Sequence, residues 1–184
     1  MPSDKVLRER ARFVATYQDN LKEIGNIPLS ILVWGPGTHP TSQLVRNKRI
    51  QIRERLEELE HNAMFSEDLE QYGQDRVLKL QELAQVVTAH HIIILLGEYT
   101  PGALAETHNF ANLPRVAWKF TVLVPKKFQD GYSANGTLLF LDKLFHSVYW
   151  YEDDEIQSCN VLGKVLERMD YVRQFYASAG GALL

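Results

Sequence analysis

The sequence predicts an α/β fold in which helices cover both faces of a mainly parallel sheet. Short apolar stretches of strand length alternate with longer segments whose apolar residues recur at helical spacing. One short stretch, residues 92–96, is an unbroken apolar run between His91 and Gly97, which is typical of a strand buried on both faces. This alternation implies parallel strands joined by crossover helices.

Length and composition fit a globular protein. The chain has 184 residues, of which 45% are hydrophobic, and its net charge of -3 gives no reason to expect nucleic acid as a partner. No apolar run approaches the roughly 20 residues that span a bilayer, and the N-terminus lacks the apolar core of a signal peptide. Cys159 is the single cysteine, so an internal disulfide is excluded. We expect a cytoplasmic protein with no membrane contact, no metal and no cofactor.

An amphipathic helix is predicted over residues 4–24, where Val6, Phe13, Tyr17 and Leu21 recur at helical spacing. Because it precedes the first strand, residues 1–27 are interpreted as an accessory helix and residues 28–184 as a single α/β domain. Packing of this helix on the domain is favoured over a contact with a partner, and a homo-oligomer remains an open alternative.

Five strands and five further helices complete the predicted domain. The strands cover residues 29–34, 62–66, 92–96, 116–124 and 147–151. The helices cover residues 42–60, 74–88, 103–112, 133–145, with Gly136 as a weak point, and 156–177. This order suits a flavodoxin-like, three-layer fold with strand order 2-1-3-4-5.

The helix over residues 42–60 is expected to turn its apolar residues inward. Leu44, Val45, Ile52, Leu56 and Leu59 are assigned to that inner face. Its basic residues alternate with glutamates and are assigned to a solvated face. The members of this basic set are Arg46, Lys48, Arg49, Arg53 and Arg55.

Two glycine-containing loops follow the first and third strands, at residues 35–40 and 97–102. In the order 2-1-3-4-5 these strands are neighbours at the point where the order reverses, and ligands of such folds bind there, beyond the carboxyl ends of the strands. A glycine loop before a helix can present backbone N–H groups to a phosphate, although a plain turn would look the same. The shared position of the two loops favours a binding site.

The segment IIILLGEYTPGALAETHNFA, together with the earlier ILVWGPG, resembles the nucleoside 2-deoxyribosyltransferase superfamily. In that family a buried strand leads through a loop of small residues to a helix that carries a Glu. The same arrangement is similar to TIR domains and to related nucleotide-binding domains with Rossmann-like folds. The two matched segments are residues 31–37 and 92–111 of the chain.

The resemblance implies cleavage or transfer at the N-glycosidic bond of a nucleoside, nucleotide or NAD. Breaking this bond develops positive charge on the sugar, which a carboxylate can stabilise or capture covalently. Glu106 is the predicted catalytic residue, since a helix start favours its ionised form. The residues predicted to bind the substrate are Gly35, Pro36, Gly37, Thr38, Glu98, Tyr99, Thr100, Gly102, Ala103 and Asn109.

Two alternatives stay open beside the enzyme. The protein can be a nucleotide-sensing module without turnover, or a TIR-like interaction module, in a bacterial defence or signalling system. A surface role for Glu106 is the simplest competing interpretation, because helices expose glutamates routinely. For His108 a satisfied polar contact is favoured over a contact with a ligand.

Overall fold

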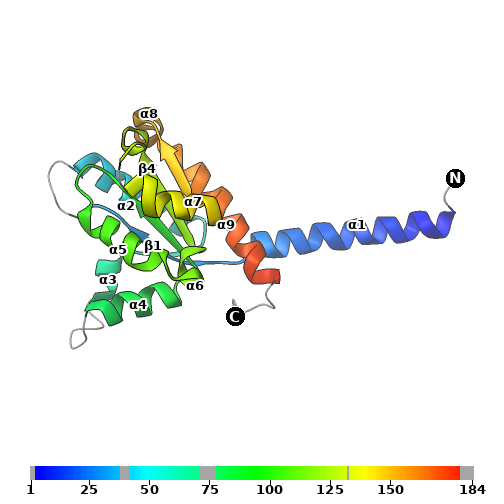
Figure 1. Ribbon diagram of the computed structural model, residues 1–184. Coiled ribbons are helices and arrows are strands. Elements are labelled where there is room, and N and C mark those ends of the chain that lie inside the picture. Colours follow the sequence, from blue (N-terminus) through cyan, green and yellow to red (C-terminus); the bar gives the residue numbers. More distant parts are fainter. Residues whose placement is uncertain (1–2, 38–41, 71–77, 132, 179–184) are drawn as a thin grey trace.

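The computed structural model describes residues 3–37, 42–70, 78–131 and 133–178, and it contains a five-stranded sheet between two layers of helices (Figure 1). The strands lie in the order β2-β1-β3-β4-β5, and each neighbouring pair is parallel. The flavodoxin-like α/β fold, its strand order and the additional N-terminal helix are therefore confirmed.

All five predicted strands are present, and each agrees with its predicted range except at the ends. They are β1 (Ser30–Trp34), β2 (Asn62–Met64), β3 (His91–Leu95), β4 (Phe120–Pro125) and β5 (Val148–Tyr151). β3 is buried along its whole length, as its continuous apolar run predicts, because helices cover both faces of the central strands.

The helices divide between the two faces of the sheet. On one face α2 (Gln43–Glu58), α8 (Asp153–Gln157) and α9 (Val161–Ser178) enclose a core that includes Ile93 and Leu95 of β3. The opposite core includes Ile92 and Ile94 of the same strand. The helices that enclose it are α4 (Leu78–Thr88), α5 (Pro101–Ala111), α6 (Pro114–Ala117), the π-helix η3 (Ala134–Leu138) and α7 (Leu139–Phe145).

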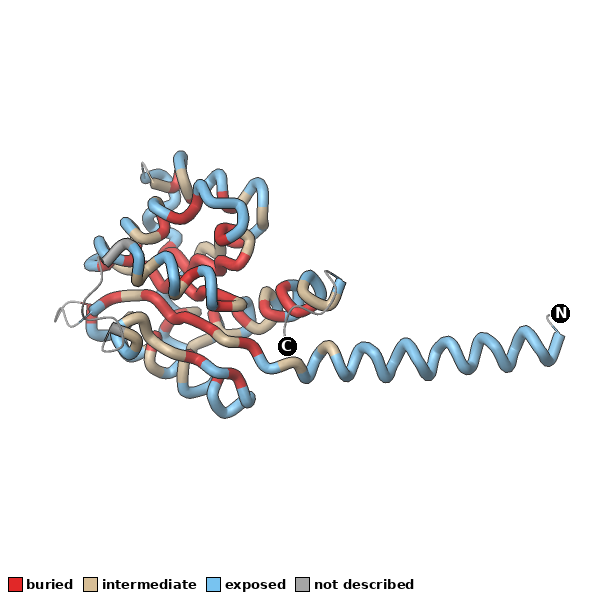
Figure 2. The backbone as a smooth tube through the Cα atoms, turned by 90° about the horizontal axis from the view of Figure 1, so that it is seen from below, coloured by how far each residue is buried: buried red, intermediate tan, exposed pale blue. Residues whose placement is uncertain are grey.

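The N-terminal helix α1 (Asp4–Gly25) forms where it was predicted, but the expectation that it packs on the domain is wrong. Figure 1 and Figure 2 show it projecting away from the sheet, and none of its residues is buried. Only the end of the helix approaches α9, where the Arg173 side chain donates a hydrogen bond to the carbonyl of Ile27. The N-terminal end of α1 is its furthest point from the domain.

Three details of the predicted elements differ from the structure. The stretch before β4 begins with α6, because Pro114 suits the first turn of a helix. Residues 66–70, for which no helix is predicted, form the short helix α3 (Ser66–Glu70). The predicted closing helix is interrupted between α8 and α9 by Cys159, whose φ of 62° is left-handed. Residues 71–77, the start of the predicted helix 74–88, lie outside the described residues.

The weak point predicted at Gly136 is confirmed. Its φ of -112° and ψ of -107° are not helical, and they mark a kink within η3. A separate finding concerns membranes: among the described helices, none combines the length and the apolar character needed to cross one.

Candidate functional site at the carboxyl edge of the sheet

The loop after β3 is closed by Thr100, whose hydroxyl bonds to both backbone groups of Gly97. Its Oγ1 accepts from the Gly97 N–H and donates to the Gly97 carbonyl, both at 3.1 Å. Thr100 is buried and serves as the N-cap residue of α5, although its hydroxyl does not cap the helix. This predicted binding residue therefore fixes the loop.

A pocket of about 280 Å³ lies beside this loop, at the carboxyl ends of β3 and β4. Its lining is mostly apolar and includes Leu104 of α5 and Phe128 of η2 (Lys126–Phe128). The other lining residues are Leu96, Gly97, Glu98, Thr100, Val124, Gly131, Ser133, Ala134 and Leu138. A flat, weakly polar ring suits such a lining, because protein pockets combine apolar walls with a few polar groups. Two predicted binding residues, Glu98 and Thr100, thus share one pocket.

Glu106 is partly buried, and it does not line this pocket. It lies two residues beyond Leu104, so the two side chains leave α5 on nearly opposite sides. Phe110, four residues after Glu106, contacts Trp34 at the end of β1 with ring centroids 6.1 Å apart. Glu106 consequently lies on the side of α5 that faces β1, one turn nearer the start of the helix.

Several predicted site residues share that side of α5 with Glu106. Gly102 and Asn109 are exposed, whereas Ala103 is buried in the core beneath the helix. The start of α5 therefore separates two regions: the apolar pocket on the side of β4, and Glu106 on the side of β1.

The loop after β1 is occupied by a side chain of the protein itself. Arg49 of α2 is buried and lies across the end of β1, where its guanidinium donates to the Val33 carbonyl at 2.8 and 3.0 Å. It also reaches the carbonyl of Pro36 at 3.5 Å. A Cβ atom added to Gly35 would lie 2.9 Å from Arg49 Cδ. The absent side chain of Gly35 thus makes room for Arg49, and Pro36 serves as its acceptor.

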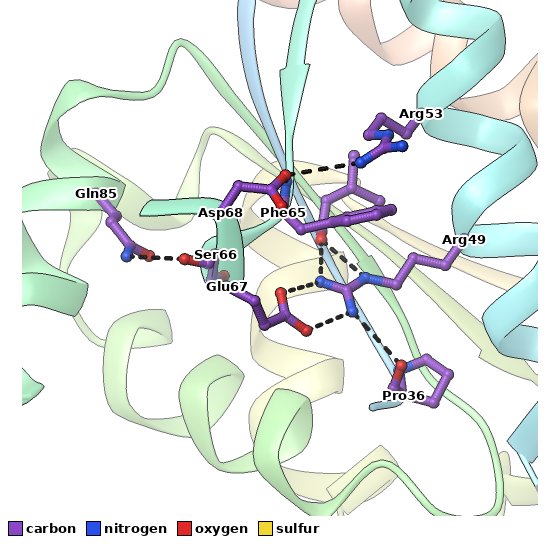
Figure 3. A network of polar contacts seen from close by, with 9 residues as sticks. Pro36, Arg49, Arg53, Phe65, Ser66, Glu67, Asp68 and Gln85 are labelled. Atoms are coloured by element: carbon purple, nitrogen blue, oxygen red, sulfur yellow. Dashed lines mark hydrogen bonds and ion pairs between the residues drawn. The ribbon is translucent and has the colours of Figure 1, made fainter. Parts of the chain in front are cut away.

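Glu67 of α3 completes the environment of Arg49 (Figure 3). Two parallel hydrogen bonds of 2.7 and 2.8 Å join the guanidinium to the carboxylate, and Arg49 lies over the ring of Phe65. Burial alone would raise the pKa of Glu67, but the hydrogen bonds from Arg49 and from the backbone hold this pKa below its usual value. Arg53 makes a longer ion pair with Asp68 beside them.

The prediction that Arg49 lies on a solvated face is wrong, because its side chain is buried. The spacing of Val45, Arg49, Ile52 and Leu56 places all four on one side of α2. Helical periodicity therefore assigns Arg49 to the inner face, whereas its charge alone suggests the solvated face. Leu44 and Leu59, which were expected inside, are exposed.

Helix α2 also contacts the second glycine loop. A Cβ atom on Gly97 would lie 3.1 Å from Cγ2 of Val45, one turn before Arg49 on the same helix. The structure therefore brings the two predicted loops together, and α2 packs closely against a glycine in each. Both glycines permit a close approach of the helix, which is a packing role that the glycine pattern alone could not distinguish from ligand binding.

The remaining predicted residues are less enclosed. Glu98 is exposed and forms an ion pair with Lys127 of η2. Tyr99 is exposed as well, and Gly37 has open space around its Cα. Thr38 lies outside the described residues.

His108 makes the satisfied polar contact that was expected of it. Its Nδ1 lies 2.5 Å from the Thr137 hydroxyl and its Nε2 lies 3.3 Å from the Ser133 hydroxyl. Hydroxyl groups can donate or accept, so they can satisfy both ring nitrogens in either tautomer. The imidazole thereby joins α5 to η3 behind the pocket.

Two other features bear on the position of the site. A second pocket, of about 390 Å³, lies at the opposite edge of the sheet and includes Ser147, Lys164 and Arg168 in its lining. It is larger, yet it is remote from both glycine loops and from the side of the sheet where ligands of such folds bind. Within the described ranges, no group of three His, Cys, Asp or Glu side chains is arranged to hold a metal ion.

The fold and this edge of the sheet define an α/β protein of the flavodoxin-like class with a candidate pocket beyond β3 and β4. Comparison of the sequence with models of known protein families and with curated proteins finds no match to either. A functional assignment therefore depends on the geometry of the carboxyl edge.

Proposed function

We propose that this protein binds a nucleoside, a nucleotide or NAD at the carboxyl edge of its sheet and cleaves or transfers the N-glycosidic bond. One observation carries the proposal: the start of α5 separates the apolar pocket of about 280 Å³ from a partly buried carboxylate, Glu106, in the second turn of that helix. In a bound nucleoside the base would occupy the pocket, and the sugar would have to cross the start of α5 to meet the carboxylate.

The chemistry requires a negative charge close to the sugar. As the bond between C1′ and nitrogen lengthens, positive charge spreads over the ring oxygen and C1′, and a carboxylate stabilises that charge or attacks C1′. Glu106 would take this role.

In the proposed arrangement the base or nicotinamide ring enters the pocket between Leu104 and Phe128. The sugar then crosses the start of α5, where Gly102 has no neighbour within 4 Å of an added Cβ and leaves a path over the helix. At the described start of the loop after β1, Arg49 takes the space beside Gly35 and Pro36, which therefore would not act as an open phosphate cradle. Backbone groups of the Glu98–Gly102 loop are the remaining candidates for phosphate contacts.

The test is release of base from NAD and from purine and pyrimidine nucleosides by wild type and by Glu106→Gln. The variant keeps the size of the side chain and removes its charge, so we expect the rate to fall by about a hundredfold or more. Glu82→Gln is the matched control: Glu82 is a partly buried glutamate on α4, on the same face of the sheet and away from the pocket. Equal rates for wild type and Glu106→Gln would disprove the catalytic assignment.

Nucleotide sensing without turnover is the second candidate, and one observation favours it. Glu106 lies outside the pocket, so a ligand could fill the pocket without meeting the carboxylate. In that case a nucleotide would raise the melting temperatures of wild type and of Glu106→Gln equally, and neither protein would release base. A panel of nucleotides read by both assays therefore separates the two functions.

A further inference from the structure

Helix α1 presents a large apolar face that nothing in the described chain covers. Phe13 is 73% exposed, and the least exposed large apolar side chain of the set is still 42% exposed. The members of this face are Val6, Leu7, Phe13, Val14, Tyr17 and Leu21. Their spacing places them along one side of the helix, which Figure 2 shows standing clear of the domain.

A helix of this kind needs a partner. Isolated helices are marginal in water, and most helical stability in proteins comes from packing an amphipathic face. The root of α1 is anchored by Arg173 and by the contacts with α9, which fix where the helix leaves the domain but do not cover its apolar face. We propose that the same face of a second copy of this chain covers it, with the two helices running antiparallel.

Arg10 favours the antiparallel direction. It lies within the apolar face, in a shallow groove with Val6, Phe13 and Val14. In a parallel pair in register, two Arg10 side chains would oppose each other within the seam, where like charges repel. In an antiparallel pair centred on Val14, each Arg10 meets the partner's Tyr17 instead. A guanidinium over an aromatic ring is a favourable contact.

The charges along the helix point the same way. The first half, residues 4–14, carries Lys5, Arg8, Arg10 and Arg12 against the acidic Asp4 and Glu9. The second half, residues 15–25, carries Lys22 against Asp19 and Glu23. Antiparallel pairing therefore lays a net basic half on a net acidic half and also opposes the two helix dipoles.

The length of α1 and the positions of the two domains also agree with antiparallel pairing. The helix has 22 residues and is about 33 Å long. Since Val14 is near its middle, pairing about this residue overlaps almost the whole of both helices. The two domains then lie at opposite ends of the pair, where they cannot collide.

The first experiment measures the mass of the full chain in solution by light scattering over a range of concentrations. Wild type should approach twice 21.1 kDa at high concentration. Phe13→Glu places a charge in the seam, so its mass should fall twofold. Thr16→Glu introduces the same residue on the outer side of the helix and should stay dimeric, which separates loss of the seam from the added charge.

The second experiment tests the direction by oxidative cross-linking in a Cys159→Ser background. A Leu7→Cys chain mixed with a Leu21→Cys chain should form a mixed disulfide dimer, since the antiparallel pair brings these positions together. Leu7→Cys alone should cross-link poorly. Efficient cross-linking of Leu7→Cys to itself would overturn the antiparallel arrangement.

Other occupants of the face give distinct results. Wild type that stays monomeric at all concentrations overturns the proposal. Flotation with anionic phospholipid vesicles, if lost in Phe13→Glu, then identifies a lipid surface as the occupant. Because these measurements read mass and cross-links, they are independent of the reaction proposed for the carboxyl edge.

Discussion

The amino edge of the sheet, where the parallel strands begin, and the carboxyl edge, where they end, differ in how far polar side chains are buried. At the amino edge several of them are buried and hydrogen-bonded to backbone groups or to each other, as are His61, His91, Lys119 and Ser147. At the carboxyl edge most of them are exposed, and opposite charges meet across loops, as Glu98 and Lys127 do. This difference indicates that the buried polar groups of the amino edge have a structural role. Exposed groups at the carboxyl edge can exchange partners with a ligand, whereas these buried groups at the amino edge are hydrogen-bonded within the protein.

Lys119 illustrates how the amino edge is built. Its ammonium group donates to the carbonyls of Val87 at 3.0 Å and Ala89 at 2.7 Å, at the end of α4. These carbonyls have no partner within the helix, and the negative end of the helix dipole favours a cation there. Burial lowers the pKa of Lys119, so the carbonyls must offset the cost of removing this charge from water.

Arg49 is a buried charge at the carboxyl edge, and removing it should have the largest effect on stability. Arg49→Met leaves the carboxylate of Glu67 and the carbonyl of Pro36 without their donor. We expect the free energy of unfolding to fall by about 3 kcal/mol, because half of Glu67 stays in water and limits the loss. Urea unfolding would measure it. Arg55→Met, on the exposed side of α2, is the control, and an equal loss in both variants would contradict a special role for Arg49.

The amino edge should be the more sensitive to acid. His91 is fully buried, with Nε2 3.1 Å from the Thr121 hydroxyl, and burial lowers its pKa to about 3. Below pH 6.5 the His91 ring takes up a proton in the unfolded chain but stays neutral in the folded protein. The free energy of unfolding therefore falls as the pH drops, by about 1.4 kcal/mol per pH unit.

His91→Gln tests that origin by removing the titrating ring. Unfolding free energies of wild type and variant, measured at several pH values between 6.5 and 5, should differ in slope by about one proton. His61 and His90, whose pKa values burial also lowers, should leave a residual slope in the variant. Parallel curves would show that His91 does not account for the acid sensitivity.

The smallest effect is expected for the exposed pair at the mouth of the pocket. Glu98→Gln breaks the ion pair with Lys127, and surface pairs contribute less than about 1 kcal/mol. The melting temperature should hardly change. If the pocket admits an anionic ligand, the affinity for that ligand should rise, because the variant removes a negative charge from the pocket entrance. A large loss of stability would instead show that the Glu98–Lys127 pair has a structural role.

The fold was predictable because its signals are local and repeated. The apolar run of β3 and the alternation of strands with amphipathic helices led directly to the observed strand order. Boundaries failed where one residue changed the local geometry, as at Pro114, which starts α6, and at Cys159, which divides α8 from α9. Both effects depend on single backbone conformations that periodicity does not report.

The site was less predictable than the fold, because it depends on contacts between distant segments. The two glycine loops are neighbours as topology required, but Gly35 and Gly97 make room for Arg49 and Val45. The environments of Glu67 and Phe65 could be found only after α2 and α3 had been placed. A prediction from hydrophobicity alone places charged residues on the outer face of a helix, so it cannot find a buried charge such as Arg49.

The shared contact of α2 with Gly35 and Gly97 has a consequence for how this edge can change by mutation. Space for a side chain at either glycine requires a shift of the same helix, since Arg49 and Val45 are one turn apart on it. Substitutions at the two positions should therefore be non-additive: once one has displaced α2, the second costs less than it would alone. The two loops form one epistatic unit, in which a tolerated change at one position alters which residues the other can accept.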